Sequence, residues 1–437
     1  AEQARRRAAA ADVIVVNTHL YGLHVGSGNV ILPAHDVVVF DEAHVLEDVM
    51  SDTVGAQIAP GRFVTLAGTV RRILDDPAQI TGVIELADVV RQPLCGHVGK
   101  RLPTPYPDDL QDALLTARGR LERVQSALGA IESPLEDARQ RKLRAQIMTG
   151  RTMEHLDLAL ADHPGYVDFV SGSPEHPRLE IAPLDVAPAL REGVWTRCTA
   201  VLTSATIPAS LPARVGLAAD QVDVADVGSP FDFEHHGLLY CAAHLPDPRD
   251  ARYRDGVHDE ITALVHAAGG RTLALFTSWK AMDLAAAAVR PRVDVPILTQ
   301  RDLPKPALTA RFAGDEATCV FATAGFFQGV DVPGRTLSLV IIDRLPFPRP
   351  DDPLLSARRE LLGPSAFSQI DLPRASMMLA QAAGRLIRTA DDRGVVAVLD
   401  RRLATARYRW DVVRALPPMR RTKDRAEVTA FLSEITR

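Results

Sequence analysis

Short apolar runs alternate with stretches of helical spacing along most of the 437-residue chain. The runs are rich in β-branched residues and bounded by turn residues, which is typical of strands buried on both faces of a parallel sheet. We predict strands at 12–16, 36–40, 166–170, 179–181, 199–202, 272–276, 319–322, 337–342 and 395–399. Helical patterns at 258–268, 279–289 and 374–387 separate the later strands. The alternation predicts doubly wound parallel sheets.

Residues 54–165 interrupt this alternation. Between Asp108 and Ile147, apolar residues recur at helical spacing among many charged ones. The pattern predicts a helical insertion in the first α/β part of the chain, and a second α/β part begins after Pro208.

The composition, with 46% hydrophobic and 24% charged residues, is that of an average soluble globular chain. It excludes disordered, collagen-like and coiled-coil classes. No window reaches the ~18 consecutive apolar residues of a membrane-spanning helix. The net charge of -5 gives no global positive field for nucleic acid, although a local basic groove can exist in an acidic protein.

The four cysteines, Cys95, Cys198, Cys241 and Cys319, lie far apart without CxxC spacing, so we expect no disulfide framework and a reducing cytosol. The chain opens with AEQARRRAAAADVIVV and no Met, as a fragment that begins inside a helix would.

The sharpest candidate for chemistry is DVVVFDEAH at 36–44, a strand that ends directly in Asp41 and Glu42. The carboxyl ends of strands face the ligand crevice in open α/β sheets. There Asp41 could hold a hydrated Mg²⁺ and Glu42 could activate water for attack on a γ-phosphate. The alternative is that both carboxylates cap the helix that follows.

A second candidate is QAAGRLIR at 381–388, at the end of a predicted helix. Arg385 and Arg388 stand three apart, so on one helical face both guanidinium groups would point at the same anion. The alternative is a solvated basic face.

Three weaker candidates also follow strands. In LTSATI at 202–207, Ser204 and Thr206 could bond across the sheet edge or cap a turn. In AGFFQGVDVPG at 324–334, glycines surround Asp331, as they do in many loops. Phe276 and Trp279, on either side of Ser278, could stack bases of a single strand or face the core.

Five segments stand in one order: DEAH, TSAT, FTS at 276–278, QGVDVPG and QAAGRLIR. Together they resemble motifs II to VI of the superfamily 2 helicases. The helical insertion, the phrase SLVIIDRLPFPRPDDP at 338–353 and QAAGRLIR resemble more narrowly the DinG branch of the XPD-like DNA helicases. The resemblance covers essentially the whole chain.

The resemblance implies an α/β fold with two RecA-like, doubly wound parallel-sheet domains and a helical, arch-like insertion in the first. Residues 1–53 and 166–207 would form the first motor domain without its N-terminal part. Residues 54–165 would form the insertion, and 208–437 the second motor domain.

The family's site residues carry over by position in the motifs. Glu42, Arg385 and Arg388 match catalytic residues; Asp41, His44, Gln381, Asp331 and Gly329 match ATP-binding residues, with Asp41 on Mg²⁺ through water; Ser204, Ala205 and Thr206 match the coupling motif; Ser278 and Trp279 are candidates for DNA binding.

The resemblance therefore implies an ATP-dependent DNA helicase for repair or replication, with ATP and Mg²⁺ as cofactors and 5′ to 3′ movement on single-stranded DNA. Expected partners are single-stranded and forked or tailed DNA. We expect a monomer in the bacterial cytoplasm, associated with the nucleoid and with no membrane.

Three departures limit these expectations. The chain has no GxxxxGK[ST] phosphate loop, so we expect little ATP hydrolysis by it alone. The family's iron-sulfur cysteines are absent from it, which leaves a cluster possible in the complete protein. Gln328 stands where most relatives carry Glu. The alternative function is a non-catalytic DNA-binding or regulatory protein that kept the helicase scaffold.

Overall fold

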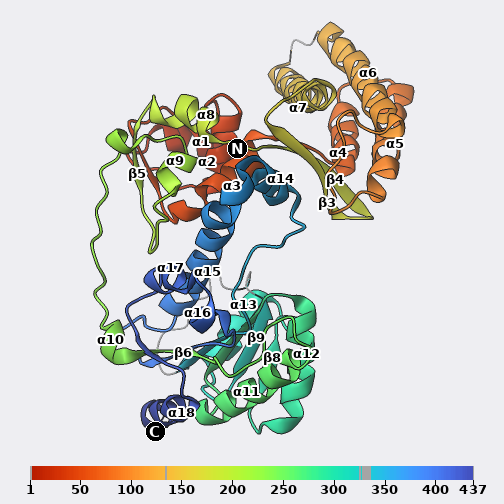
Figure 1. The fold of residues 1–437 in the computed structure, drawn as a ribbon. Helices are drawn as coiled ribbons and strands as arrows, with labels where there is room; N and C mark the ends of the chain where they lie inside the picture. The colour runs from red at the N-terminus through yellow and green to blue at the C-terminus, as the bar shows by residue number, and fades with distance from the viewer. Residues whose placement is uncertain (1, 133–134, 324–325, 327–335, 437) are drawn as a thin grey trace. The chain divides into compact units, whose positions relative to one another are not determined.

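The computed structural model describes residues 2–132, 135–323, 326 and 336–436. The chain folds into two compact units (Figure 1). The first unit is Ala1–Asp223 with Arg349–Pro364, and the second is Val224–Pro348 with Ser365–Arg437. No helix in the described ranges combines the length and the apolar character needed to cross a bilayer.

The elements of the first unit are α1 (Glu2–Ala9), α2 (Thr18–Gly26), β1 (Val37–Phe40), η1 (Ala43–Val45), α3 (Leu46–Val54), β2 (Ala56–Ile58), α4 (Pro60–Val70), α5 (Pro77–Cys95), α6 (Asp108–Ala130), α7 (Glu136–Leu160), β3 (Tyr166–Ser173), β4 (His176–Pro183), α8 (Ala187–Leu190), η2 (Arg191–Trp195), β5 (Thr199–Leu202), α9 (Leu211–Arg214), η3 (Ala219–Gln221) and α14 (Pro353–Leu362).

The elements of the second unit are α10 (Phe233–His236), β6 (Gly237–Cys241), α11 (Tyr253–Ala268), β7 (Thr272–Phe276), α12 (Trp279–Val289), η4 (Arg290–Arg292), β8 (Ile297–Thr299), α13 (Lys305–Ala313), β9 (Cys319–Thr323), β10 (Leu339–Ile342), η7 (Phe367–Asp371), α15 (Leu372–Gly384), β11 (Gly394–Val398), α16 (Arg402–Thr405), α17 (Arg409–Arg414), β12 (Arg420–Thr422) and α18 (Arg425–Ile435); η6 (Gly363–Ser365) joins the two units.

The first unit has two separate cores. One lies under the parallel pair β1–β5 and includes Phe40, Leu46 and Leu190. The other lies between helices α4 to α7 and the antiparallel sheet β2-β4-β3. The helical insertion is therefore a subdomain with its own hydrophobic core, and β3 and β4 contribute to that core.

The second unit is built on a seven-stranded sheet of order β12-β6-β11-β10-β7-β9-β8. All of its strand pairs are parallel. Alternate residues of each strand enter different cores: Val396 and Val398 lie in one, Val395 and Ala397 in the other. Helices cover both faces, α15 on one and α11, α12 and α18 on the other (Figure 1). The predicted doubly wound sheet is confirmed.

The predicted strands at 36–40, 166–170, 179–181, 199–202, 272–276, 319–322, 337–342 and 395–399 are confirmed within two residues at most of their ends, apart from the longer β3 and β4. The parallel pairing is wrong for 166–170 and 179–181, because β3 and β4 pair antiparallel with each other and β4 with β2, on the core of the insertion. The strand predicted at 12–16 is wrong. Val13 and Val15 are 79% and 92% exposed, and among the described residues no backbone hydrogen bond involves this segment. A strand requires a neighbour to pair with, and β1 pairs only with β5 in that sheet.

The compact units divide the chain differently from the predicted domains at two places. Residues 208–223 pack with the first unit, and so does 349–364, although it follows β10 of the second unit in the chain. Helix α14 packs there because Ala357 and Leu354 meet Val167 and Phe169 of β3 in a small apolar cluster. The three-part domain organisation itself stays a prediction.

Candidate active site

The ends of β1 and β5 bring two distant segments of the first unit together. The strands pair in parallel with Phe40 opposite Leu202, so the residues that follow leave the sheet at the same edge. The pairing continues past both strands: Thr203 N–H donates to the Phe40 carbonyl (2.9 Å), and Ala43 N–H donates to the Thr203 carbonyl (2.9 Å). The DEAH and TSAT segments are thus fixed against each other by main-chain bonds.

Asp41 has a carboxylate that suits a hydrated cation. Its Oδ1 accepts the Glu42 N–H (3.0 Å) and the Thr203 hydroxyl (3.2 Å). No hydrogen bond or ion pair within the described residues takes its other oxygen, and the residue is exposed. A magnesium ion that keeps several of its waters is held by one or two such carboxylates, so this residue fits the predicted role.

Glu42 has an unusual backbone. Its φ of 51° and ψ of 45° place it in the left-handed region, which a residue with a Cβ adopts at a cost. Such strain is retained where the surrounding structure imposes it, here between β1 and the short helix η1. The Glu42 side chain is 54% exposed, so its carboxylate is open to water.

Ser204 and His44 hold the Glu42 carboxylate from the protein side. Ser204 Oγ lies 3.3 Å from Glu42 Oε2, and His44 Nδ1 lies 2.8 Å from Ser204 Oγ and 3.3 Å from Glu42 Oε2. If the Ser204 hydroxyl donates to Glu42, His44 Nδ1–H donates to Ser204, and every hydrogen in the set has an acceptor. This arrangement ties the candidate base directly to the TSAT segment.

His44 is buried, with a side chain 4% exposed. Burial lowers the pKa of its imidazole, and the nearby Glu42, Asp48 and Asp41 oppose that effect only in part. His44 is therefore neutral at neutral pH, with one ring nitrogen donating and one accepting.

Thr206 has a buried hydroxyl with no hydrogen-bond partner among the described residues. Its N–H donates to Ser204 Oγ over 3.4 Å. Ala205, between the two hydroxyl residues, is exposed. The structure thus brings Ser204 into contact with the DEAH segment and the Thr206 N–H into contact with Ser204.

Helix α3 follows the DEAH segment and is anchored by buried charges that the sequence did not reveal. Glu47 forms ion pairs with Arg214 of α9 and with Arg358 of α14, the latter at 3.2 Å. Arg358 also donates to Ser51 Oγ (2.6 Å) and to the Leu184 carbonyl (2.9 Å). The side chains of Glu47 and Arg358 are almost fully buried. Their ion pair fixes α14 against α3, the helix that follows the DEAH segment.

In the second unit, Ser278 and Trp279 lie where β7 gives way to α12. Ser278 Oγ accepts the Ala281 N–H (3.1 Å), so its side chain serves as the helix cap. Trp279 is 42% exposed, which contradicts the alternative of a core aromatic, whereas Phe276 is 2% exposed and lies in the core, so the stacking prediction is wrong for Phe276. The Arg301 guanidinium lies 4.6 Å from its ring centroid and also binds Asp283.

Helix α15 ends at Gly384, before the two arginines that were predicted to share one helical face. That prediction is wrong for Arg388, whose N–H, like that of Thr389, donates to the Asp392 carboxylate (2.8 Å) in the following turn. Gln381 lies in the last turn of α15 and Arg385 directly follows it. Gln328, Gly329 and Asp331 lie outside the described residues.

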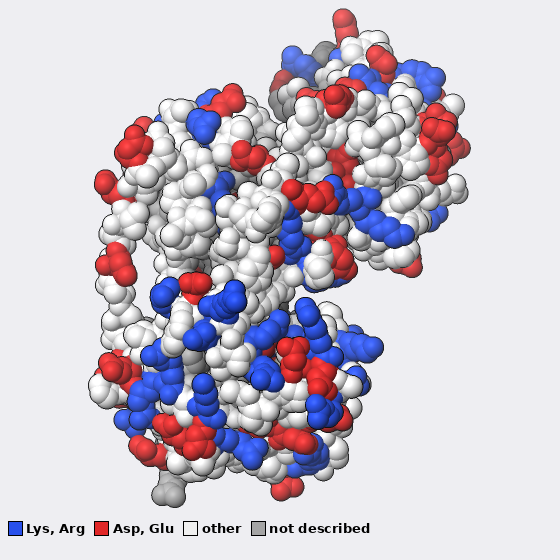
Figure 2. Space-filling model, viewed as in Figure 1, with Lys and Arg blue, Asp and Glu red and all other residues white. Residues whose placement is uncertain are grey.

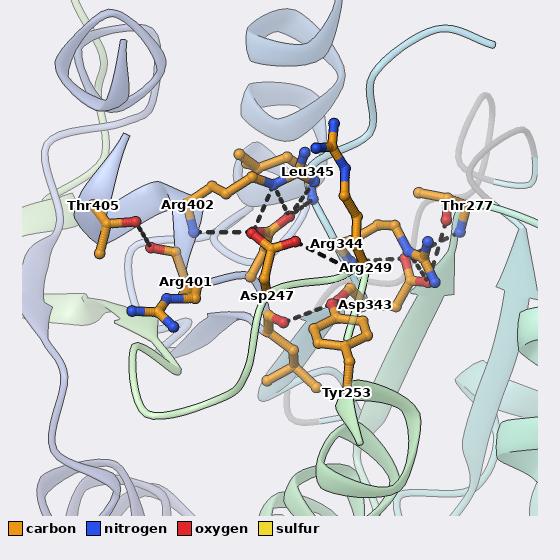
Figure 3. A network of polar contacts seen from close by, with 12 residues as sticks. Asp247, Arg249, Tyr253, Thr277, Asp343, Arg344, Leu345, Arg401, Arg402 and Thr405 are labelled. Atoms are coloured by element: carbon orange, nitrogen blue, oxygen red, sulfur yellow. Dashed lines mark hydrogen bonds and ion pairs between the residues drawn. The ribbon is translucent and has the colours of Figure 1, made fainter. Parts of the chain in front are cut away.

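A buried network joins four segments at the carboxyl edge of the second sheet (Figure 3). The Asp343 carboxylate follows β10 and accepts the N–H groups of Thr277 (3.0 Å) and Arg344 (2.8 Å). The single hydroxyl hydrogen of Tyr253 is shared between the carbonyls of Asp343 (2.5 Å) and Leu399 (2.8 Å). Burial raises the pKa of Asp343 to about 6, although Arg344 counteracts it. Asp343 was not among the candidates from the sequence, although its place directly after a buried strand could have indicated it.

The four cysteines do not fit an iron-sulfur cluster. All are free thiols in different places: Cys241 and Cys319 in the two cores of the second unit, Cys198 beside β5 and Cys95 at the end of α5. Among the described residues, no three His, Cys, Asp or Glu side chains gather as a metal site.

Comparisons with known proteins agree with this architecture. A family model described as "Helicase C-terminal domain" matches residues 261–419, most of the second unit. The solved "Structure of S. tokodaii Xpd4" has a TM-score of 0.56 with 15% identity over 88% of this chain and 75% of its own. A second structure, "XPD_Helicase", has a TM-score of 0.55 with 17% identity over 89% and 68%. The chain therefore shares the fold of these XPD structures over most of its length.

Proteins with similar sequences show to which helicase family the chain belongs. The chain is 37% identical to "ATP-dependent helicase DinG" of Mycobacterium tuberculosis (strain ATCC 25177 / H37Ra), over 100% of this chain and 68% of that protein. It is 32% identical to "ATP-dependent DNA helicase YoaA" of Escherichia coli (strain K12), over 99% and 71%. This chain belongs to the DinG family of ATP-dependent helicases.

Proposed function

We propose that this chain carries the motor of an ATP-dependent DNA helicase that moves 5′ to 3′ along single-stranded DNA and separates duplex ahead of it. Family membership supports the activity. The observation that carries the assignment in this structure is the contact of Glu42 with Ser204 and His44, which joins a candidate general base to the motif that couples hydrolysis to movement.

In the proposed reaction Glu42 accepts a proton from the water that attacks the γ-phosphate. The base needs position more than a raised pKa, because the transition state of phosphoryl transfer is loose. Ser204 and His44 supply that position, and the constrained backbone of Glu42 turns its side chain toward solvent. Asp41 would hold a hydrated magnesium ion, which neutralises charge on the phosphates.

Three residues of the second unit match nucleotide-contacting residues of the family by their position in the motif. We propose that Gln381 contacts the nucleotide and that Arg385 and Arg388 act as arginine fingers at the γ-phosphate. Their location in and after the last turn of α15 supports this role, because loop residues can reorient on a ligand. Asp331 and Gly329 keep their proposed ATP-linked role by position in the motif.

The finer properties belong to the same proposal. Trp279 would stack a DNA base, since its ring is exposed, whereas Ser278 would act through the helix start that it caps. Forked or tailed DNA as substrate, a monomeric state and a nucleoid-associated place in the bacterial cytoplasm are proposed as well. An iron-sulfur cluster would require cysteines other than these four.

A second candidate function is a non-catalytic DNA-binding or regulatory protein. One sequence feature favours it: the chain has no GxxxxGK[ST] with which to hold the β- and γ-phosphates. The intact contacts around Glu42 favour the motor, because a protein that only binds DNA has no need of a positioned base.

The test is Glu42→Gln in the natural gene product that contains this chain. We expect nucleotide binding within about twofold of wild type and ATP turnover lower by ~10²- to 10⁴-fold, the usual contribution of a general base. The matched control is Glu192→Gln, which changes an exposed glutamate of the same unit. Turnover of the Glu42→Gln protein within tenfold of wild type would remove the assigned role, and no ATP turnover by the wild-type product would favour the second candidate.

A further inference from the structure

The C-terminal part of the second unit is far more basic than the chain as a whole. Residues 400–425 contain nine Lys or Arg and three Asp, whereas the whole chain has a net charge of -5. Figure 2 shows Lys and Arg side chains gathered over α16 and α17. None of the motifs of the sequence analysis covers this segment.

Few of these positive charges are neutralised. Asp400 binds Arg402, Asp411 binds Arg414, and Asp424 caps α18. Arg425 binds Glu260. The side chains that form no ion pair with any described residue are those of Arg401, Arg407, Arg409, Arg420, Arg421 and Lys423. The segment therefore presents a surface that attracts anions.

Trp410 lies next to two of these unpaired arginines. Its side chain is 46% exposed, although an indole is one of the largest apolar groups. The guanidinium carbons of Arg409 and Arg421 lie 5.2 and 5.4 Å from its ring centroid. Arg409 belongs to α17 and Arg421 to β12, so the indole forms cation–π contacts with cations of two elements.

The donors of these guanidinium groups remain largely open. Arg409 uses one N–H for the Ala406 carbonyl (3.0 Å), and Arg421 forms no side-chain hydrogen bond with a described residue. A guanidinium that lies near an aromatic ring and lacks a carboxylate can bind phosphate with two parallel hydrogen bonds. By contrast, Arg301 beside Trp279 is already bound to Asp283.

We propose that Trp410, Arg409 and Arg421 form a contact for single-stranded nucleic acid. A single strand offers phosphates and unpaired bases side by side, which matches guanidinium donors next to an exposed indole. An acidic peptide would match the charges but leave the indole without a partner. The site rests on the proposed function, in which the chain moves on single-stranded DNA, and adds a contact that no motif supplies.

The contact is separate from Trp279. Arg421 lies on β12 at one edge of the sheet, and Trp279 follows β7, four strands away. At a strand spacing of ~4.8 Å, β12 and β7 are about 19 Å apart. The second unit would thus bind single-stranded nucleic acid at two places.

The experiment measures binding of a fluorescent oligothymidylate to this chain by anisotropy, without nucleotide, at several salt concentrations. The variants are Trp410→Ala, Trp410→Phe and Arg409→Ala/Arg421→Ala. The control is Arg292→Ala, which removes a charge of the same unit that is paired with Asp259. Thermal unfolding of each variant checks that it folds.

We expect Trp410→Ala to weaken binding about fivefold or more, with most of the affinity retained in Trp410→Phe. The double arginine variant should lower the slope of log K against log salt by about 1.4, because each phosphate contact of a single strand contributes ~0.7. The Arg292→Ala variant should bind like wild type.

Equal binding of DNA by wild type and all variants would show that the proposed contact does not exist. The proposed function would still be tested by Glu42→Gln. If the variants lose binding of an acidic peptide probe but keep DNA, the surface serves a protein partner and the inference is also overturned. No binding of DNA by the wild-type chain overturns it as well. ATP turnover that DNA fails to stimulate in the gene product would instead count against the proposed function.

Discussion

Replacement of Arg358 by Met should destabilise the first unit strongly. The methionine keeps most of the length of the side chain but removes every donor. Ser51 Oγ, the Leu184 carbonyl and Glu47 would each lose a partner in a place where Arg358 is only 5% exposed. Removing one member of a buried ion pair typically costs ~3–5 kcal/mol. Because Arg214 remains beside Glu47, we expect the lower end, about 3 kcal/mol.

The assay is urea unfolding followed by tryptophan fluorescence. Trp195 is the one tryptophan in the first unit, so a background with Trp279→Phe and Trp410→Phe reports on that unit. At an m-value of about 3 kcal/mol/M, the midpoint should fall by about 1 M. The control Arg72→Met, an exposed arginine of the same unit, should change stability by less than ~0.5 kcal/mol.

A double-mutant cycle separates the ion pair from the other contacts of Arg358. With Glu47→Gln added, the two effects should fall short of additivity by at least ~0.5 kcal/mol, because both substitutions break the same pair. A loss below about 1 kcal/mol for Arg358→Met, or full additivity in the cycle, would refute the idea that α14 is held by this buried charge network.

Two further predictions concern other buried charges. His163 binds both oxygens of Asp168 (3.1 and 2.9 Å); burial alone would lower the pKa of His163, but Asp168 and the Ala161 carbonyl raise it overall. The stabilisation of the folded state by protonated His163 is complete below the ordinary pKa of 6.5 and is lost as pH rises through the raised pKa. The urea midpoint of the first unit should therefore fall over that pH range. In the His163→Gln variant the midpoint should depend less on pH. Glu260 is 1% exposed and accepts from Tyr240 OH (2.7 Å) and Arg425 (3.1 Å). Glu260→Gln should cost about 2 kcal/mol and speed amide hydrogen exchange in α18, and unchanged exchange there would contradict its anchoring role.

The sequence predicted strands β7, β9, β10 and β11 of the second sheet well because burial on both faces leaves a clear apolar run. In β1 the prediction of burial on both faces is wrong, because Val37 and Val39 are exposed. For the TSAT segment the sequence left two alternatives open, that Ser204 and Thr206 bond across the sheet edge or that they cap a turn. The contact of His44 with Ser204 depends on the register of two strands that lie about 160 residues apart. Glu42 has its left-handed backbone between β1 and η1, and glutamate carries no local signal for it.

Local competition explains two other differences. The predicted helix stops at Gly384 rather than continuing to Ile387. The next N–H groups bond carbonyls three residues back, and those of Arg388 and Thr389 bond the Asp392 carboxylate. Ser278 was a candidate for DNA contact, yet its hydroxyl caps α12. A serine at the start of a helical pattern is the usual N-cap, so this function could have been expected from the sequence.

The pairing of β2 with β4 makes the helical insertion a replaceable module. Ala56 stands opposite Ile181 and Ile58 opposite Leu179, so the chain enters and leaves the insertion through two hydrogen-bonded strands. Paired residues of antiparallel strands have Cα atoms only ~5 Å apart, which one or two residues can bridge. Because loop length costs only ~0.6 kcal/mol for each doubling, helices α4 to α7 can differ in length at little cost as long as β3, which packs against α14, is kept. The helices of this subdomain can thus vary while the contacts that anchor α14 and α3 are retained.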